Sequence, residues 1–312
     1  MNTISELASE LIAKMPLPEE PADAARKIYA VVGAERAAAF ADRYYEGALS
    51  AGGCAGEVRA ILDEEAPELS GPCAGLASEI MLAEGCYRHI YQQRPAPNGK
   101  PMGDKVYFDT MSDIAVWAKT YLKFHGCWGY DQFGWLEHHL HGECFKLGRL
   151  QFQPVPFGHR YYSCLGRTAT EDTPVWTIHI PETGKAEPFT QEACLDSLHR
   201  AYEFTGGSEI YTTDSWLLYP AHFQFLPADG NIRRFMELFD IIDDVVKPRP
   251  ADMPRMFPAN VDFEHPETLP RDTSLRRAYA DWYTKTRVTG AGFGVIVYDG
   301  EKIISKPELY RK

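Results

Sequence analysis

Two short stretches of this chain carry side chains of the kind that move protons and stabilise negative charge. His179 and Glu182 follow the apolar run VWTI, and Asp214, Ser215 and Tyr219 follow the run EIYTT. Histidine titrates nearest to neutral pH, and burial raises the pKa of a glutamate towards it, so both are candidate bases. The hydroxyl groups of Ser215 and Tyr219 are candidate donors. We therefore expect His179, Glu182, Ser215 and Tyr219 to form a catalytic site.

Both stretches end strands of a predicted βαβ unit. Residues 175–180 and 209–219 are rich in β-branched and aromatic residues, which favour strands. Between them, Thr190 stands at an expected helix N-cap, apolar residues repeat at helical spacing, and Gly206 ends the helix. Two strands joined by a crossover helix run parallel, and open α/β sheets bind ligands at the carboxyl ends of such strands. The predicted site lies at that edge of the sheet.

Each candidate residue also has a structural interpretation. His179 suits a hydrogen-bonded strand histidine, and Glu182 suits a solvated turn. In the second stretch, Asp214 suits the cap of a bend and Tyr219 suits packing. The sequence leaves both interpretations open.

A ligand is expected where residues 182–190 enter the predicted helix. Free backbone N–H groups and the helix dipole favour an anion such as pyrophosphate there, and Lys185 adds positive charge. Arg149 and Gln151 alternate along a predicted strand, so both side chains would meet a ligand on one face. The predicted ligand-binding residues are Arg149, Gln151, Ile180, Lys185, Thr190 and Asp214.

The sequence EHHLHGEC resembles a metal cluster. On a helix, Glu137, His141 and Cys144 would share a face, and His138 lies three residues before His141, a spacing used by divalent-metal sites. No second ligand group is recognisable elsewhere in the sequence. We therefore expect no metal, and a metal-dependent hydrolase is the least favoured interpretation.

Composition limits the possible partners and location. The formal net charge of the 312 residues is −12, which disfavours nucleic acid and anionic membranes because phosphate binding needs a basic surface. No apolar run approaches the roughly 20 residues of a membrane span, and the N-terminus carries no apolar signal core. The seven cysteines form no CxxC pair, which is typical of reduced thiols. We expect a cytoplasmic protein.

The pattern of elements predicts two domains. Residues 1–103 are helical in pattern, and the Pro- and Gly-rich segment QQRPAPNGKPMGDK predicts a boundary before residues 104–312. Beyond it, KVYFDT reads as a short strand, residues 231–246 as one long helix, and GFGVIVYDG as a closing strand. The fold class is α/β (α+β): a helical domain followed by a mixed sheet.

Several blocks carry a resemblance to a known family: LGRLQFQ, TIHIPETG, TQEACLDSLHRA, DSWLLYP, NIRRF and LPRDTSLRRA. The chain resembles bacterial acyltransferase-domain proteins, which join a helical N-acyltransferase N-terminal domain to a GNAT-like C-terminal domain. The match is good from about Trp135 onward and looser before it. TTDSW departs from the CxSW expected in many relatives, which puts a thiol mechanism in doubt. The usual GNAT phosphate loop, R/Q-x-x-G-x-G/A, is absent at the crossover helix; RVTGAG matches it but leads into a predicted strand.

The resemblance implies acyl transfer from acyl-coenzyme A to an amine or hydroxyl of a small acceptor, by direct attack and without a covalent enzyme intermediate. In GNAT folds two neighbouring parallel strands splay apart and admit the pantetheine arm. The alternative is a non-catalytic GNAT-like module that binds a small molecule or a protein, which the missing phosphate loop and the acidic charge favour.

Overall fold

The computed structural model describes residues 4–184, 187–247 and 253–305. Its contacts divide the chain into two compact units: Met1–Leu147 with Pro181–Thr183, and Gly148–Ile180 with Gly184–Lys312. The Pro- and Gly-rich segment that predicts a boundary after residue 103 lies within the first unit. Each unit has its own core and is described separately.

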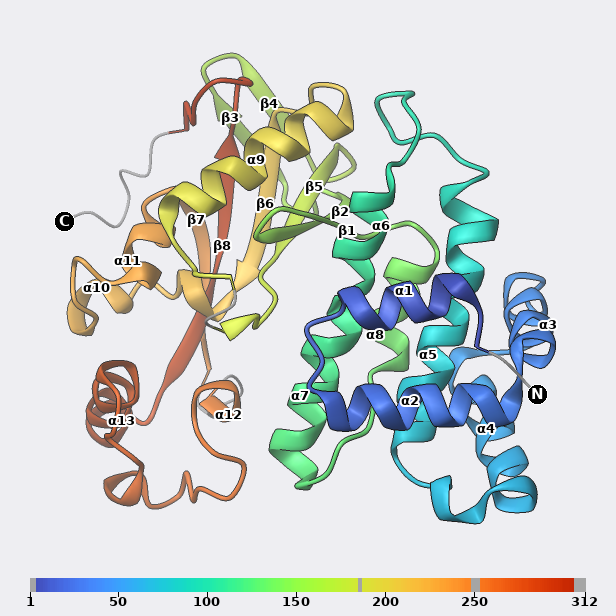
Figure 1. Cartoon of the computed structure of the whole chain (residues 1–312). Helices are drawn as coiled ribbons and strands as arrows, with labels where there is room; N and C mark the ends of the chain where they lie inside the picture. Colours follow the sequence, from blue (N-terminus) through green and yellow to red (C-terminus); the bar gives the residue numbers. More distant parts are fainter. Residues whose placement is uncertain (1–3, 185–186, 248–252, 306–312) are drawn as a thin grey trace. The chain divides into compact units, whose positions relative to one another are not determined.

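The first unit is helical. Its helix α5 is buried along almost its whole length, as expected of a helix that is apolar all round, and contacts α2, α3 and α4. Figure 1 shows α5 among the other helices of this unit. The elements are α1 (Glu6–Lys14), α2 (Glu19–Val32), α3 (Ala34–Tyr45), α4 (Ala51–Glu65), α5 (Cys73–Cys86), α6 (Asp104–Met111), α7 (Asp113–His125), α8 (Phe133–Leu140) and the short strand β1 (Phe145–Leu147).

A fully buried carboxyl group interrupts the apolar surface of α5. The side chain of Glu79 is fully buried, and neither of its oxygens has a hydrogen-bond partner among the described residues. One turn earlier α5 approaches residue 130 so closely that a Cβ on Gly75 would lie 2.5 Å from the Tyr130 carbonyl oxygen. Burial, together with the nearby charge of Glu137, raises the pKa of Glu79 well above its usual value.

The second unit is built on a mixed sheet. Its strands lie in the order β2-β5-β6-β8-β7, with β5 parallel to β6 and the other neighbours antiparallel. The bounds are β2 (Leu150–Pro156), β5 (Pro174–His179), β6 (Ile210–Ser215), β7 (Asp240–Lys247) and β8 (Thr289–Val297), with a separate hairpin of β3 (Tyr161–Cys164) and β4 (Arg167–Thr170). The helices are α9 (Gln191–Thr205), α10 (His222–Phe225), α11 (Asn231–Met236), α12 (Met253–Met256) and α13 (Ser274–Thr286).

The predicted βαβ unit is confirmed as β5, α9 and β6. The Thr190 hydroxyl accepts a hydrogen bond from the Ala193 N–H at 3.2 Å and caps α9, and Gly206 ends the helix in the left-handed conformation. The buried face of α9 includes Cys194, Leu198 and Ala201, and Figure 1 shows the helix lying along the sheet. Local sequence signals therefore set both ends of this helix.

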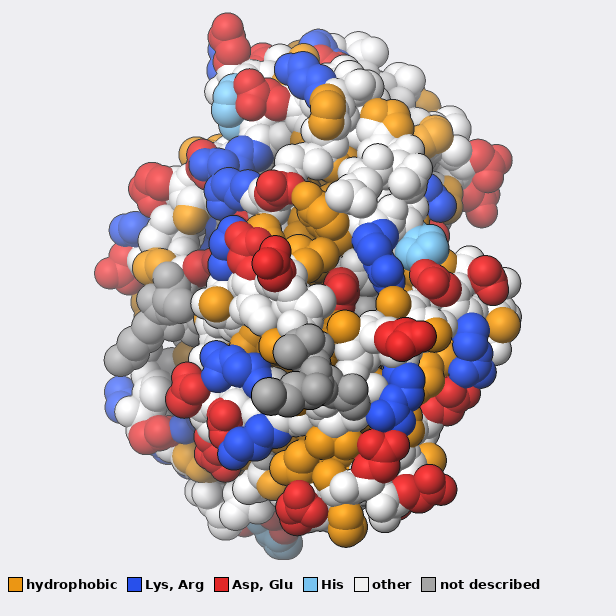
Figure 2. Space-filling view, turned by 45° about the vertical axis from the view of Figure 1, so that its right-hand side comes forward, with side chains coloured by type: hydrophobic (Ala, Val, Ile, Leu, Met, Phe, Trp, Pro, Cys, Tyr) orange, Lys and Arg blue, Asp and Glu red, His pale blue; other side chains and the backbone are white. Residues whose placement is uncertain are grey.

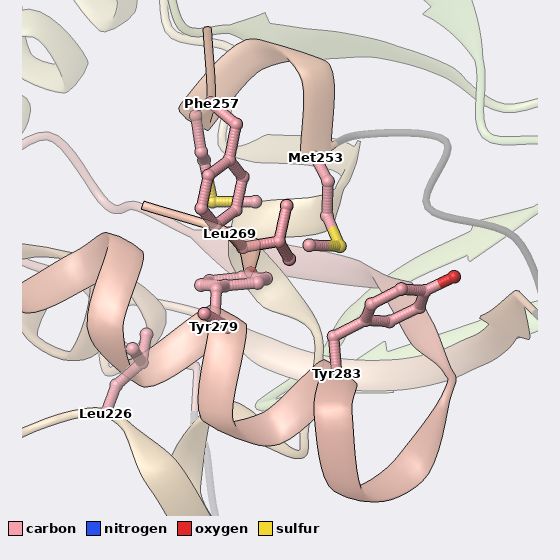
Figure 3. Close-up of a cluster of buried hydrophobic side chains, with 8 residues drawn as sticks. Leu226, Met253, Phe257, Leu269, Tyr279 and Tyr283 are labelled. Carbon is pink, nitrogen blue, oxygen red and sulfur yellow. The ribbon is translucent and has the colours of Figure 1, made fainter. Parts of the chain in front are cut away.

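Two apolar clusters stabilise this unit. One joins the β3–β4 hairpin to the sheet through Phe157, Tyr162, Ala169, Val175, Val295 and Val297. The other, drawn in Figure 3, packs α13 against α12 and the loops around it, through Leu226, Met253, Met256, Phe257, Leu269, Tyr279, Ala280 and Tyr283. Buried His222 adjoins this second cluster by a short hydrogen bond to the Tyr279 hydroxyl, and burial lowers the pKa of His222 to about 3.

Three predicted elements are wrong. KVYFDT lies in helix α6, whose buried residues Tyr107, Phe108 and Met111 have helical spacing. Residues 231–246 form the short helix α11 and then strand β7, because the β-branched residues after Phe239 pair with β8. The strand predicted to reach Tyr219 ends at Ser215, after which Trp216–Leu218 form a 3₁₀ turn. GFGVIVYDG does lie in or next to strand β8, but between β6 and β7.

The surface mixes charges of both signs. On the face drawn in Figure 2, Lys and Arg side chains are interspersed with Asp and Glu. A polyanionic partner needs an extended basic surface, which the described residues of this face do not form. No helix within the described ranges is both long and apolar enough to cross a membrane.

Candidate functional site

The pairing of the parallel strands β5 and β6 stops before either strand ends. Their ladder consists of Trp176 with Tyr211 and Thr177 with Thr212, although β5 continues to His179 and β6 to Ser215. One residue beyond, the Thr213 hydroxyl donates to the Ile178 carbonyl oxygen at 2.8 Å. A side chain thus takes the place of the next backbone bond, and the carboxyl ends of β5 and β6 are not paired with each other, although β5 stays paired with β2 and β6 with β8.

His179 is the last residue of β5, beyond the point where its pairing with β6 stops. It is half-buried, and its Nε2 lies 2.9 Å from Oε1 of Gln153 on the neighbouring strand β2. The β2–β5 register pairs His179 with Gln151 and Thr177 with Gln153, so these four side chains share one face of the sheet. The face that carries the predicted base is therefore polar at this end.

Gln151 presents a buried donor beside this histidine. Its side chain is 1% exposed, and its Nε2 has no hydrogen-bond partner among the described residues. Directly opposed residues of antiparallel strands have Cβ atoms about 5 Å apart, so the carboxamide lies near His179. A buried, unsatisfied N–H group in a native fold calls for an explanation, and a bound ligand is one.

Arg149 meets the segment that enters α9. Its Nε donates to the Glu187 carbonyl oxygen at 3.0 Å, and its guanidinium lies 5.2 Å from the centre of the Phe189 ring. The side chain is 8% exposed, and Nη1 has no hydrogen-bond partner within the described ranges. Burial lowers the pKa of Arg149, which is still charged at neutral pH. A buried cation with an unused donor is suited to an anionic ligand.

A tight turn holds Arg149 in this position, outside the strand on which we expected it. Gly148 has a φ of 81°, and a Cβ there would lie 2.8 Å from the Ser197 hydroxyl of α9. That hydroxyl accepts the Arg149 N–H at 2.8 Å and donates to the Ala193 carbonyl at 2.8 Å. Glycine is required by both the backbone conformation and the close approach.

The two predicted donors after β6 differ in their surroundings. Ser215 is half-buried, and its hydroxyl accepts the Leu217 N–H at 3.2 Å, as a cap of the following turn. Tyr219 is 4% exposed and packs so closely against β8 that a Cβ on Gly290 would overlap its ring. Burial, and then the charge of Asp244, raises the pKa of Tyr219, so its hydroxyl is protonated at neutral pH.

The remaining predicted residues that the structure describes lie on β6 or between β5 and α9. Asp214 is exposed on β6, and Ile180 is half-buried directly after β5. Glu182 is exposed and belongs to Pro181–Thr183, the short segment that groups with the helical unit. Thr190 uses its hydroxyl as the cap of α9. Lys185 lies outside the described residues.

Sequence profiles of known families cover almost the whole chain. Residues 6–142 match the N-acyltransferase N-terminal domain, and residues 144–296 match the GNAT-like C-terminal domain. The chain belongs to the family that joins these two domains. No curated protein matches it.

Solved acyltransferase structures share the fold of the chain. A mutant acyltransferase in complex with octanoyl-CoA is 19% identical, with a TM-score of 0.65 over 96% of this chain and 90% of that chain. An acyltransferase in complex with decanoyl-CoA and teicoplanin is 20% identical, with a TM-score of 0.64 over 98% and 90%. A third, with CoA and 10C-teicoplanin, is 20% identical, with a TM-score of 0.64 over 95% and 89%.

The histidine-rich stretch lies in the N-acyltransferase N-terminal domain, and its members point into different surroundings. Helix α8 ends at Leu140, so Cys144 is beyond it and buried, while His141 is exposed and stacks on Tyr44 at 5.4 Å. His138 lies 3.2 Å from Glu143. No group of three metal-ligating side chains occurs among the described residues.

Sequence reasoning missed Gln153 and Thr213 of the GNAT-like domain. Both lie on predicted strands, and neither residue type is distinctive in a strand. The sequence does indicate that Gln153 lies on the same face of the strand as Gln151, because the two residues are two positions apart. Its pairing with His179 depends on the β2–β5 register, which two strands far apart in the sequence do not reveal.

Proposed function

We propose that this protein transfers an acyl group from acyl-coenzyme A to an amine or hydroxyl of a small acceptor. The interrupted ladder between β5 and β6 carries the proposal, because in GNAT folds the pantetheine arm is expected where two neighbouring parallel strands separate. The family and the acyl-CoA complexes of the structural neighbours support the same chemistry.

The residues around the strand ends fit coenzyme A. Its pyrophosphate is an anion, and Arg149 brings a buried guanidinium with an unused Nη1 donor to the start of α9. The unsatisfied Nε2 of Gln151 is a donor for a carbonyl oxygen. Ile180 directly follows β5 and Thr190 directly precedes α9, so we include both among the proposed ligand-binding residues. The guanidinium of Arg149 thus takes the place of the phosphate loop absent from the sequence.

The proposed chemistry is direct attack. The acceptor nitrogen or oxygen bonds to the thioester carbonyl carbon, the carbon–sulfur bond breaks, and the sulfur leaves as a thiolate that takes up a proton. His179 accepts the proton that the nucleophile loses, and Glu182 assists in positioning. Ser215 and Tyr219 are the proposed hydroxyl donors, and the raised pKa of Tyr219 keeps its proton available.

The proposed acceptor is a small molecule with a nucleophilic amine or hydroxyl. Two structural neighbours were solved in complex with teicoplanin and with 10C-teicoplanin. In this chain the exposed carboxylate of Asp214, on β6, suits an acceptor that arrives as an ammonium ion. Such an acceptor must lose a proton before it attacks, and His179 is the proposed base that accepts this proton.

Thermal denaturation with acyl-CoA thioesters of increasing chain length tests the proposal. A ligand that binds the native state stabilises it by about 2.7 kcal/mol at a hundredfold excess over its dissociation constant. We expect a saturable rise in Tm for at least one chain length. Acyl transfer to a panel of amines, measured by chromatography, should fall in His179→Ala. It should not fall in the control His199→Ala, which changes an exposed histidine of α9. A protein that melts cooperatively and responds to no thioester would refute acyl-CoA binding.

A further inference from the structure

Three alternating glycines mark one face of strand β8. Gly290, Gly292 and Gly294 lie two residues apart, so a Cβ on each of them would stand on the same side of the sheet. None of the three has a positive φ, so the strand conformation itself does not require glycine. Glycine weakens the interior of a strand, and its presence there often marks the close approach of another segment.

The approaching segment is the end of the turn that follows β6. A Cβ on Gly290 would overlap the ring of Tyr219, and a Cβ on Gly292 would overlap the carbonyl oxygen of Leu218. At Gly294 the side chain of Leu218 fills the space that a Cβ would need. Leu218 and Tyr219 therefore lie directly against β8, and the glycines of RVTGAG are explained by this packing.

The orientation of the Tyr219 ring depends on packing. Its hydroxyl makes no hydrogen bond within the described part of the chain. The backbone is fixed, because the Tyr219 N–H donates to the Trp216 carbonyl oxygen at 3.1 Å and the Tyr219 carbonyl accepts the His222 N–H at 3.0 Å. The His222 ring stands edge-on to the phenol, with centroids 5.7 Å apart. What lies against the ring thus decides where the hydroxyl points.

The titratable groups near the phenol include one neutral and one acidic side chain. Burial lowers the pKa of His222 to about 3, so this histidine is uncharged at neutral pH. Burial raises the pKa of Tyr219, and the charge of Asp244 on β7 raises it further. Gly290 adds no charge, so it can influence Tyr219 only through space.

We propose that Gly290 is a positioning residue for Tyr219, because the missing side chain lets the phenol lie against β8 and so fixes the place of its hydroxyl. Gly290 acts on the reaction only through that ring. The inference rests on the proposed function for the role of Tyr219 as a hydroxyl donor. The packing of the ring is measurable without any substrate.

A stability cycle on the full chain tests the packing. Gly290→Ala should lower the Tm by at least about 3 °C, because the new methyl group has no room beside the ring. In a Tyr219→Ala background the same change should lose less than about half as much, because the ring is gone. Gly300→Ala is the control. This glycine of the same unit has a φ of 98° and adjoins Tyr202, so its loss should be equal in both backgrounds.

The cycle also covers a variant that does not fold. A Cβ on Gly290 would lie 2.6 Å from the Val245 carbonyl oxygen as well as overlapping the ring. If Gly290→Ala unfolds the protein and Gly290→Ala with Tyr219→Ala does not, the ring is what requires glycine, as proposed. Equal losses in the two backgrounds, or failure of both variants to fold, would assign the requirement to Val245 and overturn the inference.

Fluorine NMR reports the position of the ring. The full chain is labelled with 3-fluorotyrosine, and the resonance of Tyr219 is assigned through Tyr219→Phe. In Gly290→Ala this resonance should move and the phenol pKa should fall towards its ordinary value of about 10, because the ring loses its burial. Gly300→Ala should change neither. A Tyr219 resonance and pKa that Gly290→Ala leaves unchanged would overturn the inference.

Kinetics connect the packing to the reaction. Gly290→Ala and Tyr219→Phe should each lower kcat by about 10²-fold with the KM for acyl-CoA nearly unchanged, as expected when a proton donor is misplaced or removed. The double variant should be no slower than Tyr219→Phe alone, because no hydroxyl is left to position. Losses that multiply would indicate general damage and overturn the inference. A displaced ring with an unchanged kcat would leave the packing intact and refute Tyr219 as a donor.

Discussion

Replacing Glu79 by glutamine should stabilise the helical unit at neutral pH. The carboxyl group is fully buried, and its pKa is raised in the folded state, whereas in the unfolded chain a glutamate titrates near 4.3. Above that pH the unfolded chain releases a proton that the folded chain retains. The free energy of unfolding therefore falls as pH rises from about 4.3 to the raised pKa, and is constant beyond it.

The size of the effect follows from proton linkage. Inside this window each pH unit costs about 1.4 kcal/mol of stability, and Glu79→Gln removes that cost because an amide does not titrate. The variant and the wild type should be close in stability near pH 4 and diverge as pH rises. For a unit of this size, one kcal/mol corresponds to about 2–4 °C in Tm.

Scanning calorimetry between pH 4 and 8 measures this divergence directly. Glu64→Gln is the matched control, because it makes the same chemical change at an exposed residue of α4 in the same unit. Its melting curve should follow that of the wild type. If the Tm of Glu79→Gln also runs parallel to the wild type at every pH, Glu79 has a partner that keeps it ionised and the argument from burial fails.

Further outcomes follow from the site. Arg149→Ala should weaken binding of acyl-CoA at least tenfold but leave binding of an acyl-pantetheine thioester, which lacks the pyrophosphate, almost unchanged; equal losses for both in titration calorimetry would contradict the anion role. Gly148→Ala should destabilise the GNAT-like unit by about 1–3 kcal/mol, since φ is 81° and the new Cβ meets Ser197, and urea unfolding measures this. Thr190→Ala should cost about 1 kcal/mol by removing the cap of α9, and an unchanged urea midpoint would count against that role.

The elements with local signals could be predicted from the sequence. Helix α9 carries its own cap, apolar stripe and terminating glycine, and the parallel pairing of β5 with β6 follows from the crossover. The segment that contains β7 was predicted as a helix because its apolar residues at 238, 242 and 246 fit either a helical or a strand period. Tertiary pairing with β8 decides between them, and β-branched side chains favour that outcome.

The site was predictable only in part. His179 follows a strand, so its place at the sheet edge could be deduced. That Arg149 reaches the start of α9 depends on a turn whose geometry is set by Gly148 and Ser197, residues far apart in the sequence. No periodic pattern encodes such a contact. The same holds for Gln153, whose partner is fixed by register.

The position of β8 in the sheet has a consequence for how this protein folds during its synthesis on the ribosome. β8 follows every other strand of the sheet in the sequence and yet lies between β6 and β7. While residues 289–297 are still inside the exit tunnel, β6 has an open edge and β7 has no partner, a condition that invites pairing with other chains. The helical unit, by contrast, has almost all of its residues before position 148 and can pack early. Nascent chains arrested before residue 289 should therefore hold a folded first unit and depend on chaperones for the second.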